Sequence, residues 1–236
     1  MRAAVLFDLD DTLLDYSGGV EQSWETACRA EAPPDLDVAV FLPVLGEARR
    51  WFWSDPGRHR RERTNMLGAW TSIAAHALEH VGRADARAAV RIAEAFAASR
   101  RATMRLFPDA RACLERLRRR DVALALVTNG DARMQRDKIE RHGLATFFGA
   151  IVIEGEFGRG KPDAAVYAAA LRGLGRRAGE AWMVGDNLEW DVAGPQRLGL
   201  TGVWIDRAGS GLPADATVPP DRIIADLTAL EPAGRT

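Results

Sequence analysis

The chain has 236 residues, of which 47% are hydrophobic and 28% charged, so it can bury a substantial core. Lysine and arginine total 32 against 33 for aspartate and glutamate, which gives a formal net charge of −1. This balance offers no electrostatic reason to expect a nucleic-acid partner. The opening MRAAVLFDLD holds too short an apolar run for a signal peptide, and no run is long enough to span a membrane. We therefore expect a cytoplasmic protein without a nucleic-acid or membrane partner.

Cysteine and lysine are both scarce. Cys28 and Cys113 are too few for a disulfide framework or a four-thiolate zinc site, and we expect them to be small buried residues. Only Lys138 and Lys161 among the 32 basic residues are lysine. Because nearly all other basic residues are arginine, the lysine at position 161 indicates that this position requires a compact point charge.

Five short apolar runs predict strands buried on both faces, as in a parallel sheet. They are Ala3–Phe7, Val122–Val127, Ala150–Ile153, Ala181–Val184 and Thr201–Ile205. Helices are predicted after Pro108, from Asp131 to Gly143, and from Pro162 to Gly175. This alternation of strand and helix predicts an α/β fold with a doubly wound sheet.

A long insertion interrupts the alternation between the first and second strands. Phe7 and Val122 are separated by 114 residues, whereas a whole βαβ unit takes roughly 30. Four stretches of the insertion have a helical composition: Val20–Ala30, Val38–Trp53, Arg61–Val81 and Ala84–Arg105. We therefore expect a helical domain of residues 15–105, inserted into an α/β core of residues 1–14 and 106–236.

Polar sequences follow four of the predicted strands, and the carboxyl ends of parallel strands are where open sheets bind ligands. They are Asp8-Leu9-Asp10-Asp11-Thr12, Thr128-Asn129-Gly130, Gly160-Lys161-Pro162-Asp163 and Gly185-Asp186-Asn187-Leu188-Glu189-Trp190-Asp191. Clustered acids repel one another unless a cation intervenes, so we expect Mg²⁺. A metal, a lysine, a hydroxyl and turn amides together form a site for a dianion, most simply phosphate. Each sequence alone is common in turns and helix caps, so the prediction depends on all four in this order.

The sequences DLDDT, VTNG, GKPD and GDNLEWD resemble the four motifs of the haloacid dehalogenase superfamily, in that superfamily's order. The resemblance covers residues 1–14 and 106–230 and implies a Rossmann-like core. The chain is similar to the phosphatase-like branch of that superfamily. Its helical insertion occupies the place of a C1 helical cap.

The resemblance implies roles for two acids of the first motif, Asp8 and Asp10. Asp8 would be the nucleophile that forms an aspartyl-phosphate, and it would also be a metal ligand. Asp10 would protonate the leaving oxygen and then activate the hydrolytic water, while its backbone carbonyl binds Mg²⁺.

The remaining motifs are implied to hold the phosphate and the metal. Thr128 and the amide of Asn129 would hold phosphate oxygens, and Lys161 would neutralise the nucleophile and the phosphate. Asp186 would complete the metal site, with Asp191 either a ligand or a partner of a ligand.

These roles imply a Mg²⁺-dependent phosphatase of a small phosphorylated metabolite. A phosphomutase or a haloacid dehalogenase on the same core remains an alternative, as does a non-catalytic phosphate-sensing module. Asp10 favours phosphoryl transfer, because an alkoxide leaving group needs a proton donor and a halide does not. A signalling receiver would place its acceptor aspartate after the third strand, where this chain has Glu154-Gly155-Glu156. The sequence leaves open whether the protein is a homodimer.

The insertion also contains candidate residues for substrate selection. Arg49–Arg63 is rich in tryptophan and arginine, which suit rings and anionic groups, and Arg49, Trp53 and Arg60 are the candidates. His76 and His80 are four residues apart, and we expect a packed or surface pair rather than a metal site.

Overall fold

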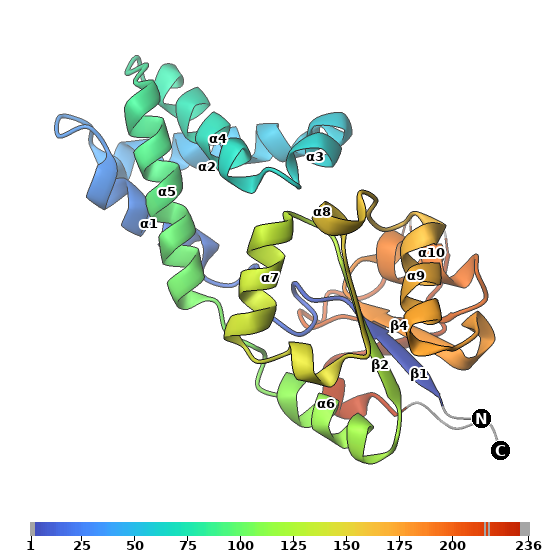
Figure 1. The fold of residues 1–236 in the computed structure, drawn as a ribbon. Coiled ribbons are helices and arrows are strands. Elements are labelled where there is room, and N and C mark those ends of the chain that lie inside the picture. Colours follow the sequence, from blue (N-terminus) through green and yellow to red (C-terminus); the bar gives the residue numbers. More distant parts are fainter. Residues whose placement is uncertain (1–2, 215, 217, 232–236) are drawn as a thin grey trace. The chain divides into compact units, whose positions relative to one another are not determined.

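The computed structural model describes residues 3–214, 216 and 218–231, which divide into two compact units. The first takes its residues from Met1–Asp15 and Arg105–Thr236 and contains the sheet. The second, Tyr16–Met104, is built from helices (Figure 1).

The described residues form one parallel sheet of six strands in the order β3-β2-β1-β4-β5-β6. The strands are β1 (Ala4–Phe7), β2 (Ala123–Thr128), β3 (Ala150–Ile153), β4 (Ala181–Gly185), β5 (Thr201–Ile205) and β6 (Arg222–Ile224). The chain adds β2 and β3 on one side of β1 and the later strands on the other. The predicted α/β, Rossmann-like fold is confirmed.

The apolar runs located five strands to within one residue at each end. The sixth strand, β6, was not predicted. It has only three residues, begins with an arginine, and leaves Ile223 52% exposed at the edge of the sheet. A short edge strand lacks the continuous burial that makes an apolar run recognisable.

Helices cover both faces of the sheet. Figure 1 shows α6 (Ala110–Arg119) and α7 (Ala132–Arg141) on one side of the strands, and α9 (Ala164–Leu174) and α10 (Gly194–Gln196) on the other. The apolar side of α9 packs on one face of β1 and β2 through a cluster that includes Val166, Tyr167, Leu6 and Val127.

Short helices and turns complete this unit. They are η1 (Ala145–Phe147), α8 (Glu154–Phe157), η2 (Ala178–Glu180), η3 (Leu188–Ala193) and η4 (Leu227–Ala229). Helix α9 begins two residues later than the predicted start at Pro162. Asp163 is its N-cap, because the Asp163 carboxylate accepts a 2.8 Å hydrogen bond from the amide of Ala165.

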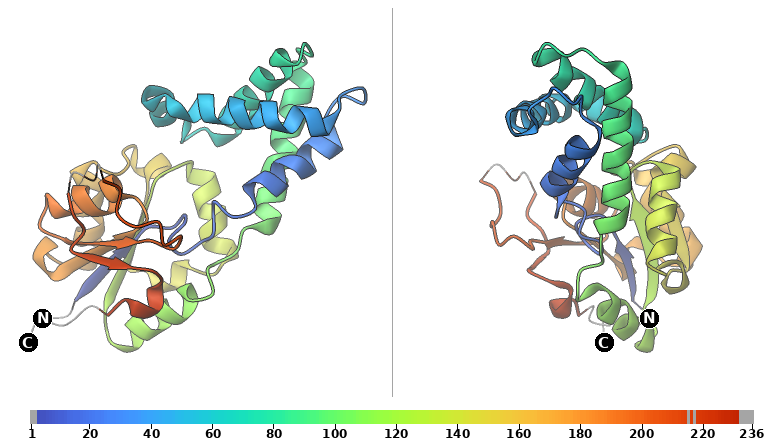
Figure 2. Two further views of the ribbon diagram at one scale, coloured as in Figure 1. Left: turned by 180° about the vertical axis from the view of Figure 1, so that it is seen from behind. Right: turned by 90° about the vertical axis from the view of Figure 1, so that its left-hand side faces the viewer.

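The helical unit contains α1 (Val20–Glu31), α2 (Val38–Ser54), α3 (Pro56–Glu62), α4 (Met66–His80) and α5 (Ala86–Thr103). Helices α1 and α5 run side by side in both views of Figure 2, and α4 contacts both α5 and α2. Trp24 stacks on Phe96 with 3.8 Å between ring centroids, and the edge of Trp70 meets the same ring. These rings form the centre of the unit's own apolar core.

The prediction of one helical stretch over Arg61–Val81 was wrong. Helix α3 starts earlier, at Pro56, where the Asp55 carboxylate accepts from the amide of Arg58. The chain then leaves the helical conformation, and Asn65 is the N-cap of α4. Composition alone does not reveal this break, because residues on both sides favour helix.

Two smaller expectations concern the cysteines and the pair of histidines. Cys28 and Cys113 are free and buried, as predicted. His76 stacks on Trp51 with 3.8 Å between centroids and lies against His80, as expected of a packed surface pair. Within the described residues, no helix has both the length and the apolar character that crossing a bilayer requires.

Candidate active site

Three of the four predicted motifs follow the neighbouring strands β2, β1 and β4 at one edge of the sheet, where the strand order reverses at β1. Asp8 directly follows β1, and its amide donates a 2.9 Å hydrogen bond to the carbonyl of Val184 in β4. Thr128 is the last residue of β2, and Asp186 directly follows β4. The topology therefore places these side chains next to one another although they are far apart in sequence.

Lys161 lies between two of the carboxylates. Its Nζ is 2.6 Å from Oδ1 of Asp8 and 2.6 Å from Oδ1 of Asp191. Lys161 and Asp191 are each 1% exposed, and Asp8 is buried too. Burial by itself would lower the pKa of Lys161, but the negative charges of Asp191 and Asp8 raise it above its usual range. Lys161 is therefore a buried ammonium in direct contact with Asp8.

The side chain of Asn129 fixes the backbone that carries Lys161. Its Nδ2 donates to the carbonyl of Lys161 at 2.9 Å, and its Oδ1 accepts from the Lys161 amide at 2.7 Å. The sequence pointed only to the backbone amide of Asn129. The structure gives the Asn129 side chain a second task, which is to hold the lysine loop beside β2.

A third carboxylate, Asp186, completes an acidic group with Asp8 and Asp191, whose ligand oxygens all lie within 4.8 Å of one another. Burial raises the pKa of Asp8 well above its usual range, by more than Lys161 lowers it. Asp186 is exposed at the rim, but partial desolvation of its carboxyl and the charges of Asp191 and Asp11 raise its pKa to about 7. One lysine does not neutralise three carboxylates. An all-oxygen donor set with excess negative charge fits a hard divalent cation such as Mg²⁺.

Asp191 reaches the site because Gly185 has no side chain. A Cβ at Gly185 would lie 2.2 Å from the carboxyl group of Asp191. Oδ2 of Asp191 accepts from the amide of Asn187 at 3.1 Å, and the Asn187 side chain caps the start of η3. The glycine and the asparagine of the fourth motif thus position its last aspartate.

Asp10 is not part of the three-acid group. Its carboxylate is turned toward α7, where Nζ of Lys138 lies 2.9 Å and 2.8 Å from its two oxygens. Nε2 of Gln135 is 3.1 Å from Oδ2 of Asp10 and 2.7 Å from Oγ1 of Thr128. The metal contact expected of Asp10 was through its backbone carbonyl, and this stays a prediction.

Sequence reasoning missed Gln135 and Lys138. The available signals were weak: Lys138 is one of two lysines, and both residues lie on the first helix after Thr128-Asn129-Gly130. Nothing local to either residue points to Asp10, which lies more than 120 residues away along the chain.

The sheet order, the motif positions and the buried Lys161 at Asp8 agree with the family that the sequence resembles. A family model described as haloacid dehalogenase-like hydrolase matches residues 3–199. The chain belongs to this family. It is therefore a hydrolase, and the residues by which its sequence resembles the family lie at the carboxyl edge of the sheet.

Individual members of the haloacid dehalogenase-like family match nearly the whole chain. A phosphoserine phosphatase of Thermus thermophilus is 37% identical over 94% of this chain and 95% of its own length. A ribulose-1,5-bisphosphate 5-phosphatase of Halopiger xanaduensis is 33% identical over 97% and 94%. The crystal structure of a 2-haloacid dehalogenase from Pseudomonas syringae is 30% identical, covers 97% of this chain and 96% of its own, and has a TM-score of 0.64.

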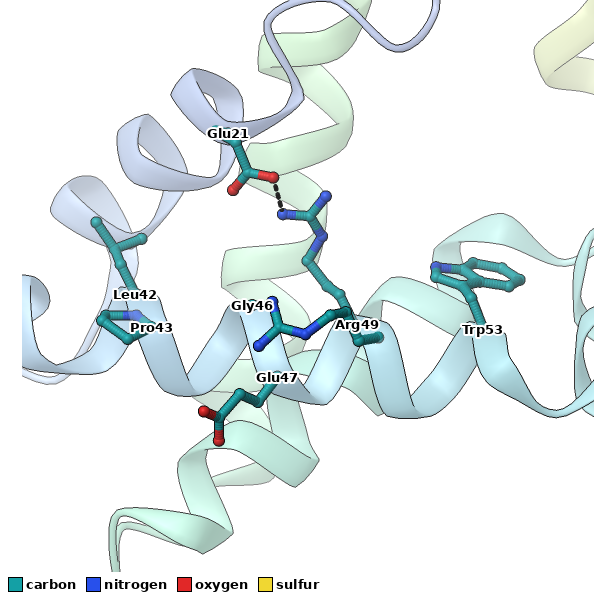
Figure 3. Close-up of a pocket in the computed structure, with 8 residues that line it drawn as sticks. Glu21, Leu42, Pro43, Gly46, Glu47, Arg49 and Trp53 are labelled. Atoms are coloured by element: carbon teal, nitrogen blue, oxygen red, sulfur yellow. Dashed lines mark hydrogen bonds and ion pairs between the residues drawn. The ribbon is translucent and has the colours of Figure 1, made fainter. Parts of the chain in front are cut away.

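The helical unit has a pocket of its own, of about 570 Å³. Its lining residues come from α1 and α2: Glu21, Leu42, Pro43, Gly46, Glu47, Arg49, Arg50 and Trp53. Figure 3 shows the guanidinium of Arg49 reaching Glu21, with 2.6 Å between Nη1 and Oε1. Two of the three candidate selector residues, Arg49 and Trp53, line this pocket, and Arg60 does not.

Proposed function

We propose that this hydrolase is a Mg²⁺-dependent phosphatase that acts on a small phosphorylated metabolite through an aspartyl-phosphate intermediate on Asp8. The observation that carries the proposal is the 2.6 Å contact of the buried Lys161 ammonium with Asp8, inside an acidic group of which Asp8 and Asp191 are buried and Asp186 is exposed. Phosphatase activity is also what the names of the Thermus and Halopiger relatives have in common.

Asp8 is the proposed nucleophile. A carboxylate attacks a dianionic phosphoryl group poorly, because both partners are negative. The buried ammonium of Lys161 offsets this repulsion at the attacking oxygen. An oxygen of Asp8 bonds to phosphorus while the ester P–O bond breaks, and the leaving oxygen takes a proton from Asp10. Water then attacks the phosphorus, and the bond between phosphorus and the Asp8 oxygen breaks, which releases inorganic phosphate and restores the Asp8 carboxylate, while Asp10 accepts the proton of that water.

The metal proposal assigns Mg²⁺ to Asp8, Asp186, Asp191 and the backbone carbonyl of Asp10. When bound, Mg²⁺ would withdraw charge from the phosphoryl oxygens and reduce their repulsion of the nucleophile. The Thr128 hydroxyl and the Asn129 amide are proposed to hold phosphate oxygens. Thr128 is well placed for this task, because it ends β2 beside Asp8 and is 2% exposed.

The helical unit is proposed to act as a cap that selects the substrate. The core motifs address only the phosphoryl group, which all candidate substrates share. Arg49 and Trp53 present a cation and an aromatic ring to one pocket, which suits the remainder of a small polar metabolite. Arg60 stays a weaker candidate, because it lies outside this pocket.

Dehalogenase activity is the second candidate, since the Pseudomonas syringae dehalogenase is 30% identical over almost the whole chain. Asp10 argues against it. Cleavage of a carbon–halogen bond needs no proton for the leaving halide. An acid two residues after the nucleophile is useful when an alkoxide leaves.

The test is to assay the purified chain against a panel of phosphorylated metabolites and 2-haloacids, measuring released phosphate and released halide. We expect phosphate release that EDTA abolishes and Mg²⁺ restores, and no halide release. Halide release without phosphate release, or phosphate release that is indifferent to chelation, would overturn the proposal.

A further inference from the structure

We propose that Gln135 and Lys138, on one face of α7, are positioning residues that hold Asp10 and Thr128 in their working orientations. The inference rests on the phosphatase function proposed above. It adds two residues outside the four motifs and gives each a different task.

Lys138 holds Asp10 by both oxygens. One ammonium at 2.8 Å and 2.9 Å from the two carboxylate oxygens fixes the rotation of that carboxylate, which a single hydrogen bond would not do. Lys138 is 7% exposed, so little solvent competes for the contact. Asp10 itself is about a quarter exposed, so in this ionised form it keeps an open side toward the water whose proton it is proposed to accept.

Gln135 sets the direction of the hydrogen bond at Thr128. The carboxylate paired with Lys138 is an acceptor, so the Gln135 amide must present its NH₂ group to Asp10. The same nitrogen lies 2.7 Å from Oγ1 of Thr128, so its second hydrogen is donated there. Thr128 is thus an acceptor toward Gln135, and its own hydroxyl proton points elsewhere. The contact of that hydroxyl with the Asn129 carbonyl is 3.4 Å long and weak, so the proton is available to an anionic oxygen.

The geometry of α7 explains why one helix serves both residues. Positions three apart lie on the same helix face, so Gln135 and Lys138 point the same way. Asp131 caps the helix by accepting from the amide of Met134 at 2.9 Å, which starts α7 directly after the second motif. The first two turns of α7 therefore lie beside Thr128.

The first experiment removes the cation with Lys138→Met and uses Arg136→Met as the matched control. Arg136 lies on the same helix and also loses an ion pair, with Glu156, but does not contact Asp10. We expect kcat for an alkyl phosphate to fall ~10²-fold in Lys138→Met and to stay within ~3-fold of wild type in the control. Lys138→Arg should recover part of the loss.

The second experiment asks whether Lys138 acts through Asp10. In an Asp10→Asn background the same Lys138→Met change should alter kcat by less than ~3-fold, because the group that it positions is already lost. A merely structural role for Lys138 would cost as much in this background as in wild type.

The third experiment reverses the hydrogen bond at Thr128 with Gln135→Glu, which keeps the shape of the side chain. The new carboxylate accepts the Thr128 proton that the phosphate would have used. We expect the inhibition constant of inorganic phosphate to rise ~10-fold or more in Gln135→Glu and to stay within ~3-fold in Lys138→Met. Circular dichroism verifies the fold of each variant, and Gln135→Met replaces Gln135→Glu if the latter does not fold.

The outcomes separate this inference from the function on which it rests. A wild-type chain without phosphatase activity overturns both. If wild type is active and Asp8→Asn is inactive, the function stands and only the inference is at stake. It is then overturned if the Lys138 and Gln135 variants match Arg136→Met, or if Lys138→Met costs as much without Asp10 as with it.

Discussion

Both lysines of the chain contact an aspartate of the first motif. Lys161 contacts Asp8, and Lys138 contacts Asp10. An ammonium is a compact charge that fits between two buried oxygens, whereas the planar guanidinium of arginine needs more room and a forked partner. At the scale of single residues, a chain with 32 basic side chains uses lysine only where the structure pairs it with one of these acids.

The acid role of Asp10 predicts a dependence on the leaving group. Asp10→Asn should slow the phosphorylation step by ~10-fold or more for alkyl phosphates and much less for p-nitrophenyl phosphate, because nitrophenolate leaves without a proton. The measurement is the single-turnover burst for each ester. Equal losses for both esters would refute the donor role, whereas a loss of steady-state turnover in both is compatible with the role of Asp10 in activating water.

At the scale of elements, α2 carries the side chains proposed to choose the substrate. Arg49 and Trp53 line one pocket along this helix. Arg49→Ala or Trp53→Ala should lower kcat/KM for the preferred metabolite by ~10-fold or more in at least one of the two variants, with a smaller effect in Arg60→Ala. Activity on p-nitrophenyl phosphate should change far less, since that substrate offers little beyond its phosphoryl group.

The comparison needs variants whose fold is verified by circular dichroism and the same metabolite panel for each. Arg87→Ala is a suitable control, because Arg87 is an exposed residue of α5 and does not line the pocket. If all variants keep the wild-type ranking of metabolites, the selecting residues lie elsewhere.

Elements and site residues differed in how far the sequence predicted them. Five strands were predictable because burial on both faces leaves uninterrupted apolar runs, and Asp8, Thr128 and Asp186 were located because each follows or ends such a run. The pairing of Lys138 with Asp10 was not predictable, because it depends on the three-dimensional approach of α7 to β1. The edge strand β6 was not predicted for a related reason, since two of its three side chains are exposed.

At the scale of the whole molecule, binding of the proposed metal at the acidic edge would be linked to stability. In the folded chain without metal, the pKa values of Asp8 and Asp186 are raised above their usual range. These two carboxyls therefore hold more protons in the folded state than in the unfolded state between about pH 4 and about pH 7, and their contribution to the free energy of unfolding falls as pH rises through that window. A cation bound to the ionised carboxylates offsets this loss.

This linkage gives a prediction for thermal unfolding. The rise in Tm caused by millimolar Mg²⁺ over EDTA should be larger at about pH 8 than at about pH 5, because protons compete with the metal at the lower pH. Asp186→Asn should reduce the Mg²⁺-dependent rise at the higher pH. A rise that is equal at both pH values, or unchanged in Asp186→Asn, would contradict the assignment of the metal to this group.

The central claim is that Asp8 carries the phosphoryl group. The most direct measurement mixes the enzyme with an excess of a good phosphate ester, quenches the reaction in acid within one turnover, and locates the modified residue by peptide mass spectrometry. We expect a phosphoryl group on Asp8, and we expect that Asp8→Asn forms no adduct and loses turnover by ~10⁴-fold or more. Turnover without a phosphoryl group on Asp8, or full activity of Asp8→Asn, would contradict it.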